Sequence, residues 1–173
     1  GLGPVELLRG HGIEVVADMP GVGANLQDHY QVKAMYRCAR PITLNDYLRN
    51  PLRKLAIGLE YALFRTGPLT MAPSQVGVFA KTRPELETPD VQYHLLPLST
   101  DMNLLGDAVS GGFGLHDFPG FTSSVCQLRP ESRGAVTIKS PDPAMAPAMR
   151  PNYLDTQTDR QTMIDGLKLA RKI

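Results

Sequence analysis

The sequence predicts an α+β fold in which an antiparallel β-sheet is flanked by helices. Several stretches have the two-residue period of half-buried strands, and others have the three-to-four-residue spacing of amphipathic helices. Clusters of Pro, Gly, Asp and Ser separate these stretches, as expected for turns. Because strands and helices do not alternate strictly, an antiparallel sheet is favoured over a parallel, doubly wound one.

The composition fits one domain with a hydrophobic core. The chain has 173 residues, 42% of them hydrophobic, and its 18 Lys and Arg against 17 Asp and Glu give a net charge of +1. This balance lacks the basic excess of nucleic-acid-binding domains, and no stretch is apolar for long enough to cross a bilayer. A small-molecule partner is therefore expected. Cys38 and Cys126 have no C-x-x-C spacing and are predicted to be buried apolar residues.

The first thirty residues are predicted to form a helix, a turn and a strand. Pro4 suits the first turn of a helix that Gly10 and Gly12 can end, and residues 13–16 have the composition of a short strand. A turn-rich loop follows at 20–25, where two glycines permit a close approach by another group. We therefore expect something to lie against this loop.

The middle of the chain changes from one period to the other. Apolar residues alternate over 30–38, which predicts a strand, and the spacing after Pro51 predicts a helix over 51–65 with a separate turn at 44–49. Four more strands are predicted at 76–82, 91–96, 122–129 and 135–140. Residues 129–134 fit a tight connection that would join the last two strands as an antiparallel hairpin.

Two further features complete the predicted organisation. Residues 100–120 carry five of the sixteen glycines without a clear period, which predicts a long loop that could cover a pocket. A final helix is capped by Asp155 or Thr156. Its predicted shared face contains Met163, Ile164, Leu167 and Ala170. Both chain ends fall inside such patterns, so we expect an internal segment of a longer protein.

Three blocks of residues together resemble the glucose-methanol-choline (GMC) oxidoreductases. The first block contains Gly1-Leu2-Gly3-Pro4, Pro20-Gly21-Val22-Gly23 and Asn25-Leu26-Gln27-Asp28-His29. It is similar to a family signature that ends in Pro-Gly-Val-Gly-x-Asn-Leu-Gln-Asp-His. The second contains Arg65 to Leu69, Gly77-Val78-Phe79 and Pro89 to His94, and the third runs from Arg129 to Leu154. The resemblance covers essentially the whole chain, and the choline dehydrogenase-like group is nearest, partly through Asp101-Met102-Asn103.

This resemblance implies a division into two parts. Residues 1–29 would be the tail of a segment of the FAD-binding domain, and residues 30–173 a substrate-binding domain that is truncated at its C-terminus. The substrate-binding domain would present one face of its sheet to the flavin.

The family activity is the oxidation of the CH-OH group of an alcohol by hydride transfer to flavin. A non-catalytic binding or scaffold protein that retains a GMC-like substrate domain is the alternative. A third possibility is self-association through surface that the rest of a longer protein would cover. The sequence itself does not indicate a localisation, and the bacterial cytoplasm is an expectation from the family resemblance alone.

FAD is expected to be a cofactor of the longer protein rather than of this chain alone. Family members bind the ADP half of FAD on a G-x-G-x-x-G turn after a strand. The stretch that starts at Gly21 begins like such a turn, but Leu26 replaces its third glycine. The family's catalytic His and its His or Asn partner would lie beyond residue 173, so no residue here is predicted to be catalytic.

No metal site or hydrolase triad is expected from the sequence. The four histidines are scattered, with no Cys or carboxylate at ligand spacing, and no serine stands in a G-x-S-x-G turn.

Two groups of site residues follow from the resemblance. The cofactor-binding candidates are Asn25, Leu26, Gln27, Asp28 and His29, which would lie near the flavin and position it. For His29, a histidine hydrogen-bonded at the start of a strand is the competing interpretation. The substrate-pocket candidates are Gln75, Phe79 and Tyr93. Ordinary sheet core is the competing interpretation for Phe79 and Tyr93. His94 has two interpretations, a residue that faces the pocket and a hydrogen-bonded core histidine.

Gln75 bears on the identity of the substrate. Choline-oxidising relatives resemble this stretch but place a carboxylate where Gln75 stands. A neutral amide does not balance a quaternary ammonium group, and a chain without Trp is poorly supplied for an aromatic cage. Choline is therefore not the expected substrate.

Overall fold

The computed structural model describes residues 1–72, 74–101 and 114–172. Within them the chain forms two compact units, one of Gly1–Tyr30 with Arg129–Thr162 and the other of Gln31–Leu128 with Met163–Ile173. Residues 102–113 of the predicted loop, including Met102 and Asn103, lie outside the described residues. The described flanks of that loop meet in a bridge between Thr100 and Leu115.

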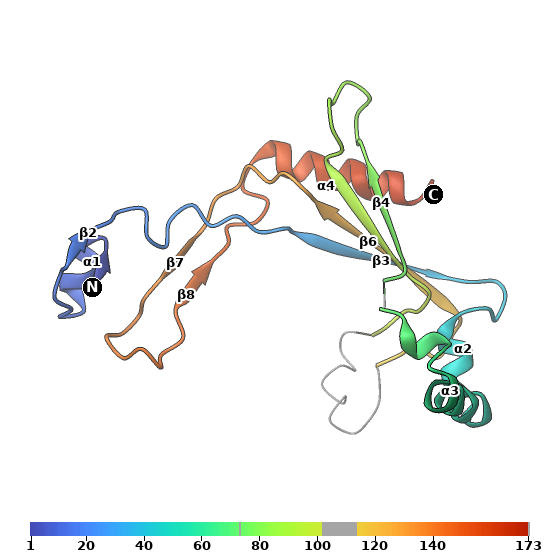
Figure 1. Ribbon diagram of the computed structural model, residues 1–173. Helices are drawn as coiled ribbons and strands as arrows, with labels where there is room; N and C mark the ends of the chain where they lie inside the picture. The colour runs from blue at the N-terminus through green and yellow to red at the C-terminus, as the bar shows by residue number, and fades with distance from the viewer. Residues whose placement is uncertain (73, 102–113, 173) are drawn as a thin grey trace. The chain divides into compact units, whose positions relative to one another are not determined.

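A four-stranded antiparallel sheet forms the centre of the second unit (Figure 1). Its strands are β3 (Gln31–Arg37), β4 (Val76–Ala80), β5 (Val91–Leu96) and β6 (Gly120–Gln127), in the order β3-β6-β5-β4. All neighbouring pairs run antiparallel. The predicted α+β fold with an antiparallel sheet and flanking helices is thus confirmed.

Helix α4 (Gln157–Ala170) packs on one face of this sheet, and Gly166 is the point of closest approach. A Cβ atom at Gly166 would lie 2.9 Å from a methyl group of Val125, so any side chain would push the helix away. Tyr93 extends from β5, and its hydroxyl donates to the carbonyl oxygen of Gly166 at 2.9 Å. Val91, Tyr93 and Val125 are all 0% exposed, which marks this interface as the core of the unit.

The buried stripe of α4 differs from the predicted one. Thr156 caps the helix as predicted, because its Oγ1 accepts from the backbone N–H of Asp159 at 3.1 Å. Met163 and Ala170 are buried as predicted, whereas Ile164 is 46% exposed and its predicted place on this face is wrong. The stripe includes the polar Asp159 and the side-chain-free Gly166, which a search for apolar residues overlooks.

Helices α2 (Leu44–Arg49) and α3 (Pro51–Phe64) are separated by Asn50, whose side chain caps α3. Its Oδ1 accepts from the backbone N–H groups of Leu52 and Arg53 at 3.0 and 3.2 Å, and Pro51 occupies the first helical position. The predicted helix over 51–65 is therefore confirmed. The predicted turn at 44–49 is the short helix α2, which a capping box at Thr43 begins; the 3-10 helix η1 (Pro68–Thr70) follows α3.

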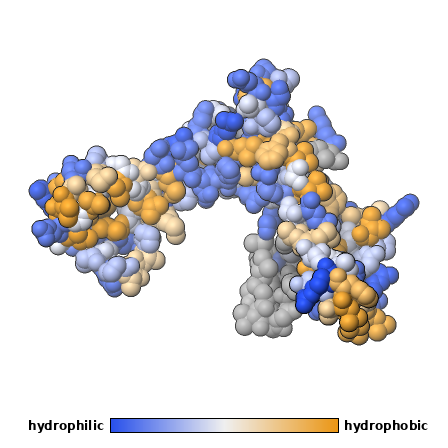
Figure 2. Space-filling view, viewed as in Figure 1, coloured by the Kyte–Doolittle hydropathy of each residue, from blue (hydrophilic) through white to orange (hydrophobic). Residues whose placement is uncertain are grey.

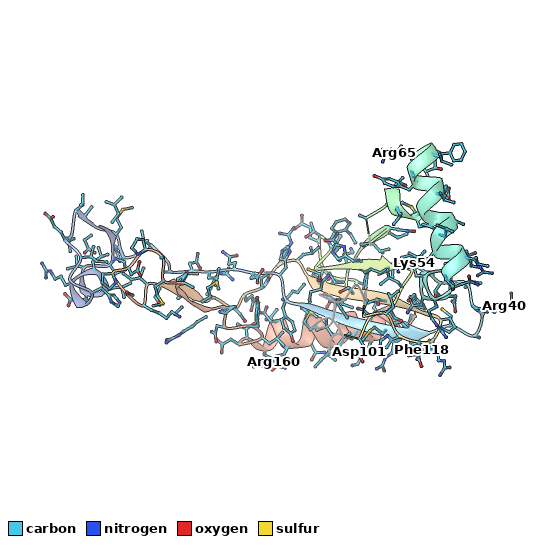
Figure 3. The ribbon with its side chains drawn as sticks, turned by 90° about the horizontal axis from the view of Figure 1, so that it is seen from below. Arg40, Lys54, Arg65, Asp101, Phe118 and Arg160 are labelled. Atoms are coloured by element: carbon cyan, nitrogen blue, oxygen red, sulfur yellow. The ribbon has the colours of Figure 1, made fainter. Side chains whose placement is uncertain are left out.

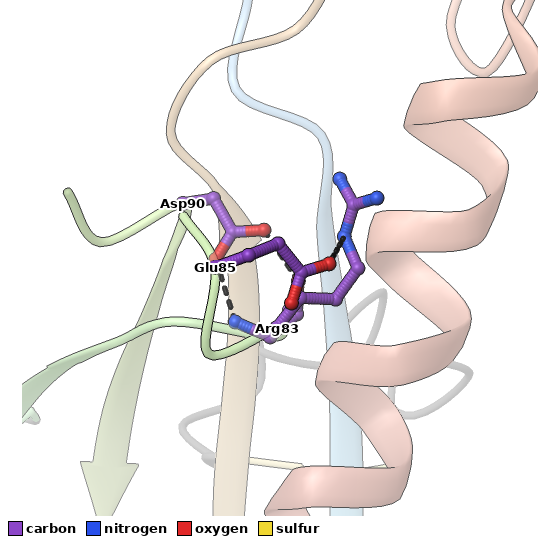
Figure 4. Close-up of polar contacts among 4 residues, drawn as sticks. Arg83, Glu85 and Asp90 are labelled. Carbon is purple, nitrogen blue, oxygen red and sulfur yellow. Dashed lines mark hydrogen bonds and ion pairs between the residues drawn. The ribbon is translucent and has the colours of Figure 1, made fainter. Parts of the chain in front are cut away.

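Asp90 fixes the connection between β4 and β5 (Figure 4). Its carboxylate accepts from the backbone N–H of Thr82 at 2.8 Å and from the Thr82 hydroxyl at 2.5 Å. Within the same turn Arg83 and Glu85 form an exposed ion pair with an N–O distance of 4.0 Å. The buried carboxylate holds the ends of the two strands together, while the exposed pair contributes little.

The first unit is built from two small sheets. Strands β1 (Leu2–Gly3) and β2 (Ala17–Asp18) pair in parallel and flank α1 (Val5–Gly10). Strands β7 (Ala135–Thr137) and β8 (Ala148–Arg150) pair antiparallel. The predicted helix at Pro4 is confirmed, but the predicted strand at 13–16 is wrong, because the strand that pairs with β1 is β2 at Ala17–Asp18.

The predicted hairpin of 122–129 with 135–140 is also wrong. β6 pairs with β3 and β5, whereas β7 pairs with β8. The connection at 129–134 is occupied by other bonds: the Asp159 carboxylate accepts from the backbone N–H groups of Glu131 and Ser132 at 2.9 and 2.8 Å, and from the Ser132 hydroxyl. A tight hairpin would need these same backbone groups.

We expect Tyr93→Phe to lower the free energy of unfolding by about 1 kcal/mol, because it leaves the Gly166 carbonyl without its buried donor. Burial, followed by the nearby charge of Asp90, raises the pKa of Tyr93 to about 12. In the unfolded chain tyrosine titrates near 10, so wild-type stability should fall as the pH rises from about 10 to about 12, and the variant should lose this part of the decline.

Urea denaturation at neutral and alkaline pH measures both effects. Tyr61→Phe, at a partly exposed tyrosine on α3, is the control. Equal stabilities of the Tyr93→Phe and Tyr61→Phe variants would contradict the role given to the Tyr93 hydroxyl.

Candidate functional site

The sheet face opposite α4 is the first candidate site, and we call it the polar face. Alternation along each strand places every second residue there, and the register aligns these residues in rows across the sheet. One row contains Phe79, Gln92, Cys126 and Gln31. The next contains Gly77, His94, Ser124 and Lys33, and a third contains Leu96, Thr122 and Met35. Most of these side chains are polar, in contrast to the apolar face beneath α4.

The structure brings two of the three predicted pocket residues to this face. Phe79 lies in the first row and is 60% exposed. Gln75 precedes β4, its backbone N–H donates to Leu95 at 3.1 Å, and the alternation places it on the same side as Gly77 and Phe79. Tyr93 lies on the opposite face, against α4, so the three residues do not line one surface together.

The charged residues within the four strands all have one sign. The four strands of the sheet contain no Asp or Glu, and their formal charges are those of Lys33 and Arg37 on β3. Both belong to the polar face by alternation. Ser124 and His94 stand beside Lys33 in the same row, and the Ser124 hydroxyl is buried without a hydrogen-bond partner among the described residues. Sequence reasoning missed Lys33 and Ser124 because only the register brings them beside His94.

The run of residues 25–29 in the first unit is the second candidate site. Leu26 exchanges two backbone hydrogen bonds with Gly134, at 2.9 and 2.8 Å, and the Gly23 carbonyl accepts from Val136 at 2.7 Å. Gly23 has a φ of 79°, and a Cβ atom there would collide with the Val136 carbonyl oxygen. The predicted close approach to this loop is therefore made by β7 of the same chain.

Asp28 gives the run its second attachment. Its carboxylate accepts from the Tyr153 hydroxyl and from the backbone N–H of His29 at 2.8 Å. The Tyr153 ring also packs against Tyr30, with 5.2 Å between ring centroids. The hydrogen bond to Asp28 raises the pKa of Tyr153 above its ordinary value. The backbone is thus held at Leu26 and Asp28.

The remaining three residues of the run, Asn25, Gln27 and His29, are exposed. Asn25 adopts the left-handed backbone conformation, with a φ of 58°. The run thus combines three exposed polar side chains with a backbone that is attached at Leu26 and Asp28. Elsewhere in the described residues, no three His, Cys, Asp or Glu side chains gather in a way that could hold a metal ion. Nor is any described helix both long and apolar enough to span a membrane.

Comparison with known proteins shows which family the chain is similar to. Residues 130–173 match the family model described as GMC oxidoreductase. The fold agrees: a formate oxidase structure covers 98% of this chain with a TM-score of 0.83 and 24% identity, and the chain covers 33% of that structure. An FAD-dependent oxidoreductase from Chaetomium thermophilum covers 98% with a TM-score of 0.74 and 18% identity, and the chain covers 34% of it. The predicted resemblance to the GMC oxidoreductases is therefore confirmed.

The chain is also similar to oxygen-dependent choline dehydrogenases. It is 39% identical to the enzyme of Pseudomonas fluorescens over all 173 of its residues. It spans 29% of the length of that relative.

Asp28→Ala should lower the pKa of Tyr153 toward the ordinary tyrosine value of 10.0, because the hydrogen bond and the negative charge that disfavour the phenolate are both removed. Titration of ¹³C-labelled tyrosine followed by NMR measures this shift. Glu131→Ala, which removes an exposed carboxylate of the same unit, is the control. A Tyr153 pKa unaffected by Asp28→Ala would rule out this attachment of the run.

Proposed function

We propose that the longer protein containing this chain is an FAD-dependent oxidoreductase that oxidises the CH-OH group of an alcohol. The observation that carries the proposal is the difference between the two faces of the sheet. One face is sealed by α4, and the other carries polar side chains and the exposed Phe79. The chain would supply one wall of the substrate site, and the match to GMC oxidoreductases supports this role.

In this proposal the residues of the polar face position the alcohol. FAD, when held by the longer protein, would supply the hydride acceptor, and a residue outside 1–173 would supply the base for the hydroxyl proton. Gln75 and Phe79 contact the substrate from the β4 side of the sheet. Tyr93 acts as a core residue that fixes β5 against α4, in line with its buried hydrogen bond.

Asn25, Gln27 and His29 would orient the flavin ring from the first unit. Their exposure and the fixed backbone at Leu26 and Asp28 support this assignment. The chain has no G-x-G-x-x-G turn to hold the pyrophosphate of FAD, so we propose that these contacts position a flavin that other segments bind.

Titration with FAD, followed by flavin fluorescence, checks this division of roles. The 173-residue chain should not saturate at high micromolar FAD, whereas the longer protein should bind FAD stoichiometrically. In the longer protein, Asn25→Ala with His29→Ala should weaken FAD binding by about tenfold, the equivalent of one lost hydrogen bond to each side chain. His11→Ala is the matched histidine control. Tight, stoichiometric FAD binding by the 173-residue chain would overturn the proposed division.

We also propose that the isolated chain self-associates through the outer side of α3. The predicted apolar stripe of this helix is exposed: Leu52 is 76% and Leu55 60% accessible, and Leu59 and Leu63 are exposed as well. Ile57, the buried residue of α3, lies about 140° around the helix from Leu52. Figure 2 shows a hydrophobic patch over α3, and Figure 3 labels Lys54 on this helix and Arg65, the residue that follows its last turn.

Sedimentation velocity measures this association. Leu52→Asp with Leu55→Asp should weaken it by about tenfold or more, because charges replace apolar anchors at the contact. Val16→Asp, at an exposed valine outside α3, should leave it unchanged. A wild-type chain that sediments as a monomer at high concentration would contradict the proposal.

A further inference from the structure

The row of Lys33, Ser124 and His94 crosses the middle of the polar face. Ser124 on β6 is the direct register partner of Lys33 on one side and of His94 on the other. Side chains at such paired positions on one face have Cβ atoms about 5 Å apart. The row therefore places an ammonium group, a hydroxyl group and an imidazole next to one another.

Ser124 Oγ is one of two buried side-chain polar atoms without a hydrogen-bond partner in the described residues, and His116 Nδ1 is the other. Ser124 as a whole is 2% exposed, and its side-chain hydroxyl has no hydrogen-bond partner among the described residues. Its neighbour on β6, Thr122, is also buried, but the Thr122 hydroxyl donates to the Leu98 carbonyl at 2.9 Å. A buried hydroxyl without a partner is rare, because it loses its bond to water and gains nothing in return. Within the described residues this hydroxyl is therefore a donor without an acceptor.

The fourth member of the row leaves space for a bound group. Gly77 on β4 is the register partner of His94 and has no side chain. An added Cβ atom there would meet only Gln92 Nε2, at 3.8 Å. The row is thus filled on the β3 and β6 side and open on the β4 side, next to Gln75 and Phe79.

The charge of the polar face selects the kind of group. With no Asp or Glu in the four strands, a cation bound here would have no opposite charge from the sheet, and Lys33 and Arg37 would repel it. An anion would instead be attracted by Lys33. A carboxylate could accept hydrogen bonds from the Ser124 hydroxyl and from an imidazole N–H of His94.

We propose that this row binds the carboxylate of a hydroxy acid, so that the substrate of the longer protein is an alcohol bearing an anionic group rather than choline. The inference rests on the proposed oxidation of an alcohol at the polar face and adds the class of substrate. Lys33 supplies the charge, Ser124 and His94 supply donors, and the open end of the row beside Gly77 leaves room for the rest of the substrate.

The first test compares three alcohols on the FAD-loaded longer protein: 4-hydroxybutanoate, the neutral 3,3-dimethyl-1-butanol, and choline, which has the shape of the neutral alcohol. We expect kcat/KM for the hydroxy acid to exceed both others by about tenfold or more. Ser124→Ala and Lys33→Gln should each raise KM for the hydroxy acid by about tenfold with little change in kcat, and should leave the neutral alcohol nearly unaffected. Lys139→Gln, at an exposed lysine outside the sheet, is the matched control.

The second test measures binding without turnover, by calorimetric titration of the same protein with butanoate. Butanoate should bind the wild type and the Lys139→Gln variant, and its affinity should fall by about tenfold in the Ser124→Ala and Lys33→Gln variants. Equal affinity in all four proteins, or no binding to the wild type, would overturn the proposed row even if alcohols are oxidised. Loss of butanoate binding in the row variants, together with no flavin reduction by any alcohol, would uphold the anion site and contradict the proposed oxidation instead.

Discussion

The close contact between α4 and the central sheet depends on Gly166 having no side chain. A Cβ atom at that point would lie 2.9 Å from a methyl group of Val125 and 3.3 Å from one of Val91, and the Gly166 carbonyl accepts from the Tyr93 hydroxyl. Because the tyrosine hydroxyl donates to the helix backbone itself, the contact fixes the position of α4 along the sheet as well as its distance. Packing alone would hold the helix near the sheet, but the hydrogen bond sets which turn of α4 lies over β5.

This contact also decides which residues are available for chemistry. Successive residues of a strand alternate between faces, so once α4 covers Tyr93 and Val125, their neighbours His94 and Ser124 must belong to the other face. A shift of β6 by one residue would exchange these sets and bury the polar residues under the helix. The cover on one face and the polar character of the other are therefore consequences of a single register.

Much of the fold could be predicted from the sequence, because its signals are local. The period of β3, the proline and asparagine that begin α3, and the Thr156 cap of α4 are all readable within a few residues. The predicted hairpin was wrong because the connection that would form it is bound elsewhere. Its backbone N–H groups donate to Asp159, which is 27 and 28 residues away in the sequence. The candidate site follows the same rule: motifs pointed to Gln75 and Phe79, but the grouping of Lys33, Ser124 and His94 comes from pairing between distant segments.

The overall charge of the chain conceals how its charges are used. Acidic and basic residues nearly balance, with 17 against 18, yet the carboxylates with clear structural roles act at connections. Asp28 holds the run before β3, Asp90 holds the turn between β4 and β5, and Asp159 holds the segment after β6. Each accepts a hydrogen bond from a backbone N–H group that needs an acceptor. The only charged side chains within the four strands of the sheet are cationic. A chain with a net charge of only +1 thus has a sheet whose charged side chains are all cationic. A substrate at this sheet would meet their local field and not the net charge.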